Sequence, residues 1–255
     1  MHKIKALLFD LDGTVYRGSD AIPGAAEFIR NLKIPYLFVT NRGNRTPEAV
    51  AEQLSAMGLS CSADQVLTSA QAAAANLMPG TSAYCIGESG LTTALEGRGV
   101  RIIGEGLEIP DAVVVSYDRG FSYEKITQAL RFINAGARFI ATNDDRVITI
   151  EDGLVPEAGP LVAAIAEATG RVPEILGKPN APIMEIALER LGVLAENTAI
   201  VGDNLLTDIL AGHNSSMKSV LILTGVSTRE EAALADYKPT WIVENYDDLA
   251  QTLPL

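Results

Sequence analysis

Short apolar runs alternate with helix-favouring segments along the first third of the chain. The run over 4–9, interrupted only by Lys5, predicts a buried strand. A helix is predicted over 22–32, since Pro23 suits a first helical turn, and a second strand over 35–39. This alternation of strand and helix predicts parallel βα units joined by right-handed crossovers.

The alternation begins again after the turn Met78-Pro79-Gly80, and once more after Gly177-Lys178-Pro179. The pattern predicts further strands over 83–86, 112–116, 138–142, 198–202, 220–223 and 240–243, a hairpin over 148–155 that turns at Asp152-Gly153, and helices over 69–77, 91–96, 123–135, 161–168, 182–191 and 209–212. We therefore predict an α/β fold in which a core, residues 1–78 and 178–255, is split by an inserted α/β domain, residues 79–177.

Two carboxylates spaced i, i+2 follow the first predicted strand. Asp10 and Asp12 precede Gly13, which allows a sharp turn, and Thr14, which offers a hydroxyl. In an open α/β sheet, ligands bind just outside the carboxyl ends of the strands. Because two like charges so close repel each other, a cation or a shared proton between them would explain the spacing. Taken alone, the motif is equally compatible with a solvated turn.

Polar residues also follow three later apolar segments. They are Thr40 with Asn41, the single cation Lys178, and the acidic pair Asp203 and Asp208. Each has an ordinary structural explanation by itself: a turn, a solvated lysine, or a charge near a helix N-terminus. Four such groups in order, each at the end of a predicted strand, favour one chemical site.

Composition narrows the partners and the compartment. The net charge of −12 argues against nucleic acid and anionic membranes as partners, because both attract basic surfaces. No apolar stretch approaches the roughly 20 residues that a spanning helix needs. Cys61 and Cys85 lack metal-ligand spacing, which favours free thiols in a reducing compartment. With no charged-then-apolar leader at the N-terminus, we expect a cytoplasmic protein.

Together these motifs resemble those of the haloacid dehalogenase superfamily, over essentially the whole chain. The four matching motifs are Asp10-x-Asp12-Gly13-Thr14, Thr40, Lys178 and Gly202-Asp203-x-x-x-x-Asp208. The insertion resembles the α/β (C2-type) cap of subfamily IIA, with its ribonucleotide monophosphatases and p-nitrophenyl phosphatases. The variant Arg42-Gly43-Asn44 is similar to a branch of bacterial sugar-phosphate phosphatases. The resemblance implies a Rossmann-like, doubly wound parallel-sheet core.

The resemblance also implies a reaction. Asp10 would attack phosphorus to form an aspartyl phosphate, and Asp12 would act as general acid and then general base. Mg²⁺ would be held by Asp10, the backbone carbonyl of Asp12, and Asp203. Lys178, with Thr40 and Asn41, would bind the phosphate.

Supporting and selecting roles follow by position. Asn204 and Asp208 would orient Asp203, Lys178 or a metal-bound water, and the cap would close over the substrate. The expected substrate-selecting residues are Arg42, Asn143, Asp144 and Asp145. Since caps of this type often pack as dimers, a homodimer formed through the cap is expected.

We therefore predict a Mg²⁺-dependent phosphomonoesterase for small organic phosphates such as sugar phosphates or nucleoside monophosphates. A phosphomutase of the same superfamily would share the nucleophile but return the phosphoryl group to its substrate. A phospho-receiver signalling domain also clusters aspartates and a lysine, although it is one short domain and leaves the insertion unexplained. A dinucleotide-binding fold is disfavoured because Gly87-Glu88-Ser89-Gly90 lacks the G-x-G-x-x-G spacing.

Overall fold

The computed structural model describes residues 3–150 and 153–254, which form two compact units. Of the described residues, the unit called here the core unit comprises 3–40, 48–67 and 178–254. The other, called the insert unit, comprises 41–47 and 68–177. The chain thus passes between the units four times, at 40/41, 47/48, 67/68 and 177/178. The predicted domain boundaries at 78/79 and 177/178 stay a prediction.

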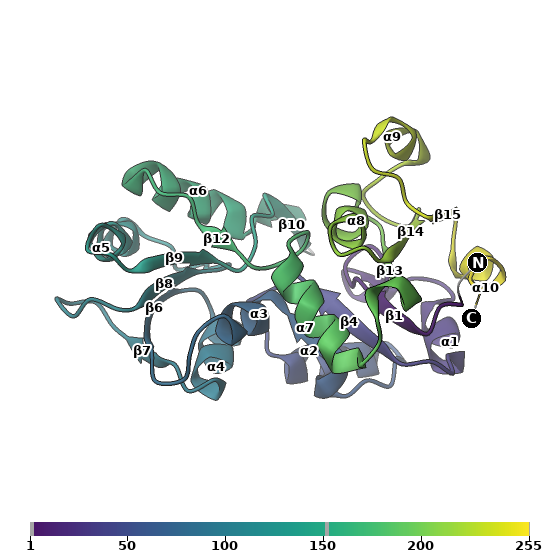
Figure 1. Cartoon of the computed structure of the whole chain (residues 1–255), viewed down its shortest axis with the longest axis horizontal. Helices are drawn as coiled ribbons and strands as arrows, with labels where there is room; N and C mark the ends of the chain where they lie inside the picture. The colour runs from purple at the N-terminus through teal and green to yellow at the C-terminus, as the bar shows by residue number, and fades with distance from the viewer. Residues whose placement is uncertain (1–2, 151–152, 255) are drawn as a thin grey trace. The chain divides into compact units, whose positions relative to one another are not determined.

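The core unit is built on a six-stranded sheet in the order β15-β14-β13-β1-β4-β5 (Figure 1). The strands are β1 (Ala6–Phe9), β4 (Tyr36–Thr40), β5 (Val66–Thr68), β13 (Thr198–Gly202), β14 (Lys218–Ile222) and β15 (Trp241–Val243). From β1 the chain moves outward through β4 and β5, and it returns on the other side of β1 through β13. The central pairs are parallel, with Phe9 opposite both Val201 and Phe38. This is the doubly wound arrangement predicted from the sequence.

Helices and a short hairpin complete the core unit. The helices are α1 (Ala25–Asn31), α2 (Pro47–Ala56), α7 (Ala181–Leu191), α8 (Leu210–Asn214), α9 (Arg229–Leu234) and α10 (Tyr246–Thr252), and the hairpin is β2 (Tyr16–Arg17) with β3 (Asp20–Ala21). The unit has its own apolar core, in which the ring of Phe9 lies 6.2–6.3 Å from the rings of Phe28, Tyr36 and Phe38. This packing holds β1, and therefore the turn that follows it, against α1 and β4.

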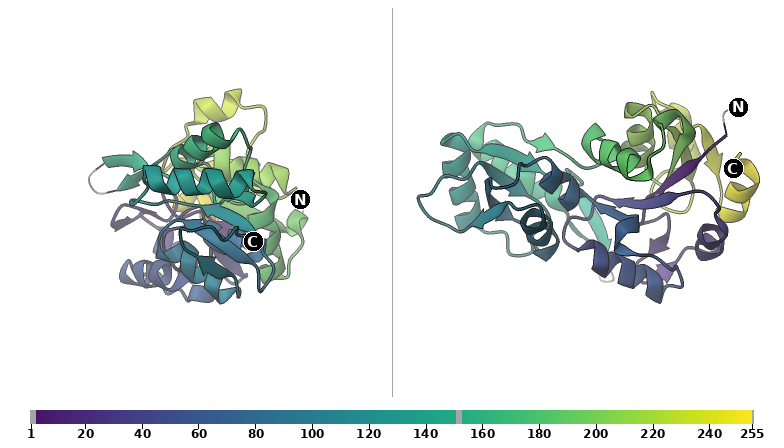
Figure 2. Two further views of the ribbon diagram at one scale, coloured as in Figure 1. Left: turned by 90° about the vertical axis from the view of Figure 1, so that its left-hand side faces the viewer. Right: turned by 60° about the horizontal axis from the view of Figure 1, so that its bottom comes forward.

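The insert unit has a second parallel sheet, in the order β12-β9-β8-β6-β7. Its strands belong to the blue to green part of the ribbon in Figure 2. Its strands are β6 (Ser82–Ile86), β7 (Arg101–Ile103), β8 (Ala112–Val115), β9 (Arg138–Ala141) and β12 (Glu174–Ile175); its helices are α3 (Ser69–Ala75), α4 (Ser89–Gly97), α5 (Tyr123–Asn134) and α6 (Ala158–Thr169). A hairpin joins β10 (Val147–Ile150) to β11 (Gly153–Pro156). A separate apolar cluster, including Phe132, Phe139 and Ile165, fills this unit.

The structure confirms the predicted fold class and differs in detail. The short strands β5 and β7 and the helices α9 and α10 were not expected, and the predicted hairpin turn at Asp152 lies outside the described residues. After Asp203 the chain is helical from Leu205, four residues earlier than predicted, because the Asn204 side chain accepts a hydrogen bond from the Leu206 N–H at 2.9 Å. None of the described helices has the length and apolar character needed to cross a membrane.

Candidate active site

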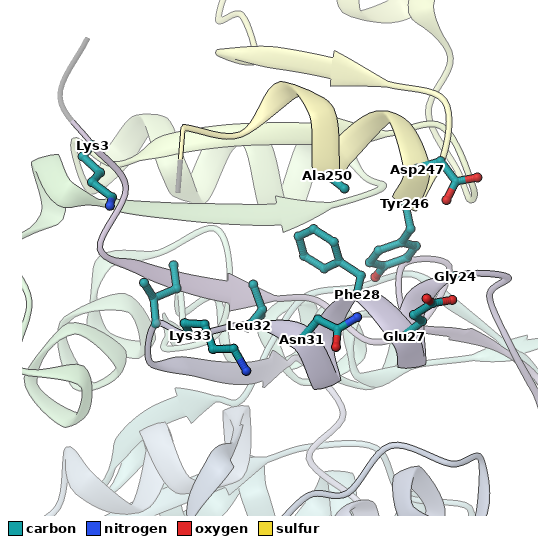
Figure 3. Close-up of a pocket in the computed structure, with 11 residues that line it drawn as sticks. Lys3, Gly24, Glu27, Phe28, Asn31, Leu32, Lys33, Tyr246, Asp247 and Ala250 are labelled. Atoms are coloured by element: carbon teal, nitrogen blue, oxygen red, sulfur yellow. The ribbon is translucent and has the colours of Figure 1, made fainter.

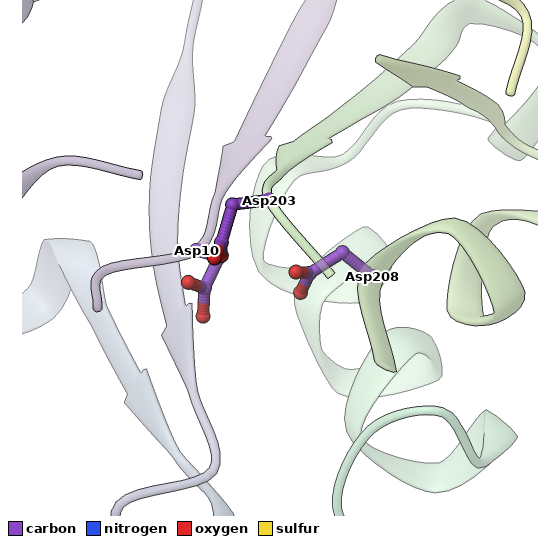
Figure 4. Close-up of side chains that lie close together, drawn as sticks. All are labelled: Asp10, Asp203 and Asp208. Atoms are coloured by element: carbon purple, nitrogen blue, oxygen red, sulfur yellow. The ribbon is translucent and has the colours of Figure 1, made fainter. Parts of the chain in front are cut away.

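Three buried carboxylates meet at the carboxyl edge of the core sheet (Figure 4). Asp10 follows β1 and Asp203 follows the adjacent β13, and the Asp10 N–H donates to the Val201 carbonyl at 2.9 Å. Asp208 lies in η3 (Leu205–Ile209), a short π-helix. One carboxylate oxygen from each of the three lies within 4.8 Å of the others. Because the chain leaves β1 and β13 in opposite directions, this is the position where doubly wound sheets bind ligands.

Lys178 lies between two of these acids. Its Nζ donates to Asp10 Oδ1 at 2.5 Å and to Asp208 Oδ1 at 2.7 Å, and the residue is 1% exposed. Burial alone would lower the pKa of this lysine, but the charges and hydrogen bonds of Asp10 and Asp208 raise it above its ordinary value. Lys178 is therefore a fixed positive charge in the site.

The charges in this cluster do not balance. Burial, together with the charges of Asp10 and Asp208, raises the pKa of Asp203 to about 8. Burial likewise raises the pKa of Asp208 to about 7, against the opposing effect of Lys178. A divalent cation would relieve this repulsion, and three carboxylates supply the oxygen ligands that Mg²⁺ prefers. The donor set thus fits Mg²⁺.

Close backbone packing fixes the Asp203 side chain. The Val226 N–H donates to its Oδ2 at 2.7 Å, and the Thr14 hydroxyl donates to its Oδ1 at 3.3 Å. A Cβ on Gly225 would lie 1.8 Å from Asp203 Oδ2, and one on Gly13 would lie 2.4 Å from it. Gly13 also has a φ of 83°, a conformation that favours glycine. Any side chain at either position would displace the carboxylate.

Asp12 and Asp208 differ in their surroundings. The Asp12 side chain is half-buried, and its Oδ2 accepts from the Tyr16 hydroxyl at 3.2 Å. Asp208 is fully buried, and its second oxygen accepts from the Asn204 N–H at 3.2 Å. The sequence suggested a supporting role for Asp208, yet one of its oxygens belongs to the carboxylate group that could hold a metal.

The predicted phosphate-binding pair is divided between the two units. Thr40 ends β4 in the core unit and is buried, whereas Asn41, the next residue, packs within the insert unit. There the Asn41 carbonyl accepts from Ser69 Oγ at 2.6 Å and from Asn143 Nδ2 at 2.8 Å. The Asn41 side chain donates from Nδ2 to Asp145 Oδ2 at 3.0 Å.

The four predicted substrate-selecting residues have unequal exposure. Asn143 is fully buried, Arg42 and Asp145 are half-buried, and Asp144 is exposed. A guanidinium nitrogen of Arg42 donates to the Thr149 carbonyl at 3.2 Å. All four belong to the insert unit.

Sequence reasoning missed a buried acid beside these residues. Glu157 precedes α6 and is 3% exposed, and its carboxylate accepts from the Ala158 N–H. Burial raises the pKa of Glu157 to about 8, and the charge of Asp145 adds to this shift, while Ala158, Asn143 and Arg42 oppose it. No sequence signal marks this acid, because Glu is an ordinary residue near a helix N-terminus.

A cavity of about 590 Å³ lies elsewhere in the core unit, between α1 and α10 (Figure 3). Phe28 and Tyr246 line it, with lysines Lys3 and Lys33 and acids Glu27 and Asp247. None of the predicted site residues lines this cavity, so its size does not make it the candidate active site.

Comparisons with known proteins agree with this geometry. A profile described as haloacid dehalogenase-like hydrolase matches residues 7–101, and a second, described as HAD-hydrolase-like, matches residues 175–249. A 5'-nucleotidase, YutF of Bacillus subtilis (strain 168), is 41% identical over 260 residues, covering 100% of this chain and 99% of its own length. An acid sugar phosphatase of Staphylococcus aureus (strain USA300) is 41% identical over 254 residues, covering 97% of each chain.

Solved structures show the same fold. A glycerol phosphate phosphatase from Mycobacterium tuberculosis, solved in complex with magnesium, superposes with a TM-score of 0.92 at 34% identity, covering 98% of this chain and 79% of that one. A 4-nitrophenylphosphatase from Thermotoga maritima superposes with a TM-score of 0.90 at 33% identity, covering 98% and 97%.

Fold and site together define a doubly wound α/β hydrolase with a buried acid–lysine centre and a second, inserted parallel sheet. The chain belongs to the haloacid dehalogenase-like hydrolases, among the phosphatases that carry a capping sheet. The resemblance inferred from its motifs is thereby confirmed.

Proposed function

We propose that this protein is a Mg²⁺-dependent phosphomonoesterase that works through an aspartyl phosphate on Asp10. The buried group Asp10, Asp203 and Asp208, balanced only in part by Lys178, is the observation that carries the proposal. Mg²⁺ bound by these acids and by the Asp12 carbonyl would neutralise the phosphate and polarise its oxygens. The magnesium complex of the mycobacterial relative supports this assignment.

Asp10 carries out the first step. Its carboxylate forms a bond to phosphorus while the bond to the leaving alkoxide breaks, and Asp12 donates a proton to that alkoxide. Lys178 orients Asp10 through the 2.5 Å hydrogen bond. The Thr40 hydroxyl and the Asn41 backbone bind the oxygens of the transferring group.

Asp12 also completes the second step. It takes a proton from water, the water oxygen bonds to phosphorus, and the bond to Asp10 breaks, which releases inorganic phosphate and restores both acids. The Tyr16 hydroxyl donates to Asp12 Oδ2 at 3.2 Å and orients it for these two proton transfers. Asn204 supports this centre through its N–H bond to Asp208.

Small phosphomonoesters are the proposed substrates. The relatives are a nucleotidase, sugar phosphatases and a glycerol phosphate phosphatase, so sugar phosphates, nucleoside monophosphates and glycerol phosphate form the test range. We propose that Arg42, Asp144 and Asp145 of the insert unit, the predicted cap, select among these substrates. We also propose a homodimer formed through the insert unit. Burial raises the pKa of the Cys85 thiol to about 12, which suits a stable free thiol in the cytoplasm, the proposed location.

Phosphate release from a panel of these esters, with and without Mg²⁺, tests the proposal. Wild type should show metal-dependent release, and Asp10→Asn should show none. Asp236→Asn, the same change at an exposed aspartate of the core unit, should retain full activity. Folded wild-type protein that releases no phosphate would contradict a phosphatase. Phosphate moved within the substrate would instead identify a mutase.

A further inference from the structure

A segment of the chain itself occupies the ligand-binding edge of the insert sheet. β6 and β8 are neighbours from which the chain departs in opposite directions, which is the arrangement that binds ligands in doubly wound sheets. Gly43 packs there so closely that a Cβ on it would lie 2.5 Å from the oxygen of Ser116, which follows β8. The same Cβ would lie 3.4 Å from the oxygen of Thr142, which follows β9.

The residues on either side of Gly43 are held equally closely. A Cβ on Gly90, in α4, would lie 2.5 Å from the Arg45 nitrogen, and the Gly90 N–H donates to the Asn44 carbonyl at 3.1 Å. A Cβ on Gly177 would lie 2.6 Å from Asn41 Oδ1. Gly43 within the segment 41–45, and Gly90 and Gly177 beside it, therefore allow this close packing.

Two buried side chains hold the start of this segment. Ser69 Oγ and Asn143 Nδ2 both donate to the Asn41 carbonyl, at 2.6 and 2.8 Å, and both residues are fully buried. A carbonyl oxygen has two lone pairs, so these bonds use its full acceptor capacity. The Asn143 amide is itself fixed, because its Oδ1 accepts from the Asp145 N–H at 3.0 Å. The peptide plane after Asn41 is therefore fixed from within the insert unit.

We propose that Ser69 and Asn143 are positioning residues. They fix the conformation of the Asn41 backbone, which binds the transferring phosphate together with Thr40. The inference rests on the proposed function, in which Asn41 binds the transferring phosphate. It assigns Asn143 to the phosphate rather than to the choice of substrate, because Asn143 is fully buried and its amide is taken up by the chain. A displacement of about 1 Å in a group that positions the substrate can lower the rate about 100-fold.

Asn143→Asp is the sharpest test, since it keeps the shape of the side chain and loses the donor to the Asn41 carbonyl. Gln128→Glu is the matched control: it makes the same amide-to-carboxylate change at a buried insert residue that donates to the Gly106 carbonyl at 2.8 Å. Asn143→Ala and Ser69→Ala remove each donor without adding a charge. Unfolding temperatures identify any loss that is due to stability alone.

Four quantities are measured: kcat/KM on several esters, the affinity for orthovanadate by calorimetry, the Mg²⁺ concentration for half-maximal activity, and the unfolding temperature. We expect Asn143→Asp to lower kcat/KM and vanadate affinity about 10–100-fold, and by the same factor for every ester. Ser69→Ala and Asn143→Ala should each give a smaller loss of the same kind. The Mg²⁺ requirement should not change, and Gln128→Glu should leave vanadate affinity within about twofold of wild type.

Unchanged vanadate affinity in folded Asn143→Asp and Asn143→Ala would overturn the inference. So would a changed ranking of the esters with vanadate affinity unaltered, since that would place Asn143 on the organic part of the substrate. An equal loss in Gln128→Glu would show a merely structural effect. Vanadate binding reads the phosphate site without turnover, so a wild type that binds vanadate but hydrolyses no ester would overturn the proposed function separately.

Discussion

The two units share a doubly wound topology, but the sheet edge that binds ligands in such folds carries charged groups in one unit and neutral polar groups in the other. In the core unit, the edge beside β1 and β13 holds Asp10 and Asp203, and their charges are only partly neutralised by Lys178. In the insert unit, the edge beside β6 and β8 holds neutral hydroxyls and amides and is occupied by the segment 41–45. The same topology thus makes a reaction site in one unit and an anchor in the other.

The energetics of the two edges differ accordingly. Buried charges of one sign destabilise the core unit unless a cation joins them, so this unit gains stability from its ligand. The Asn41 carbonyl accepts from the neutral donors Ser69 and Asn143, and the Thr142 hydroxyl donates to Ser116. Such a network stabilises a single arrangement. The difference can be tested by changing charges in each unit.

The largest effect is expected for Lys178→Met, which removes the buried cation from the core unit. Leaving its acids unpaired should lower the free energy of unfolding by about 3–5 kcal/mol and phosphate release by about 10²–10³-fold. The matched change in the insert unit is Lys125→Met. Lys125 is 29% exposed and forms an ion pair with Asp118 at 2.5 Å, so its loss should cost about 1 kcal/mol or less. Denaturant unfolding and phosphate release measure both, and equal losses would contradict the contrast.

A smaller effect is expected for Gly225→Ala. The new Cβ would overlap the Asp203 carboxylate, so the Mg²⁺ concentration for half-maximal activity should rise about tenfold, the effect typical of disturbing a metal-ligand environment. Gly97→Ala is the control, because a Cβ there meets nothing within 4 Å. A Mg²⁺ titration of activity compares them. An unaltered requirement in Gly225→Ala would argue against Asp203 as a ligand.

The smallest effect on turnover is expected for Glu157→Gln, which acts on the pH dependence of stability in the insert unit. The pKa of Glu157 is raised from 4.5 to about 8, so between these values the folded protein keeps a proton that the unfolded chain has lost. Wild-type stability should therefore fall as pH rises through this window, by at most about 1.4 kcal/mol per pH unit. The slope should be shallower in Glu157→Gln and unchanged in Glu167→Gln, an exposed site on α6. Thermal unfolding of the wild type and both variants from pH 5 to 8 measures these slopes.

The sequence allowed the carboxylate centre to be predicted because parallel strands end at a common edge. Asp10 and Asp203 follow short apolar runs that predicted buried strands, and the structure places their carboxylates close together. The start of the helix after Asp203 could not be located from periodicity, since it depends on the Asn204 cap and begins with the short π-helix η3. The exact roles of the site residues stay predictions.

Contacts between residues distant in the sequence account for what was missed. Asn143 reaches an Asn41 carbonyl 102 positions away, and no local pattern signals that pairing. Gly225 is one glycine among 22, and only its distance to Asp203 sets it apart. Burial of Glu157 likewise depends on the packing of α6.

Because the chain passes between the units four times, the insert unit cannot be exchanged with that of a relative as one continuous segment. Residues 41–47 pack with 68–177, so the insert unit is encoded by two separate stretches of the gene. A chimera that exchanges only 68–177 with a relative would leave Gly43 facing foreign counterparts of Ser116 and Thr142. A chimera that also exchanges 41–47 keeps those partners together. Exchange of the insert unit between relatives therefore requires the short stretch and the long one to be inherited jointly.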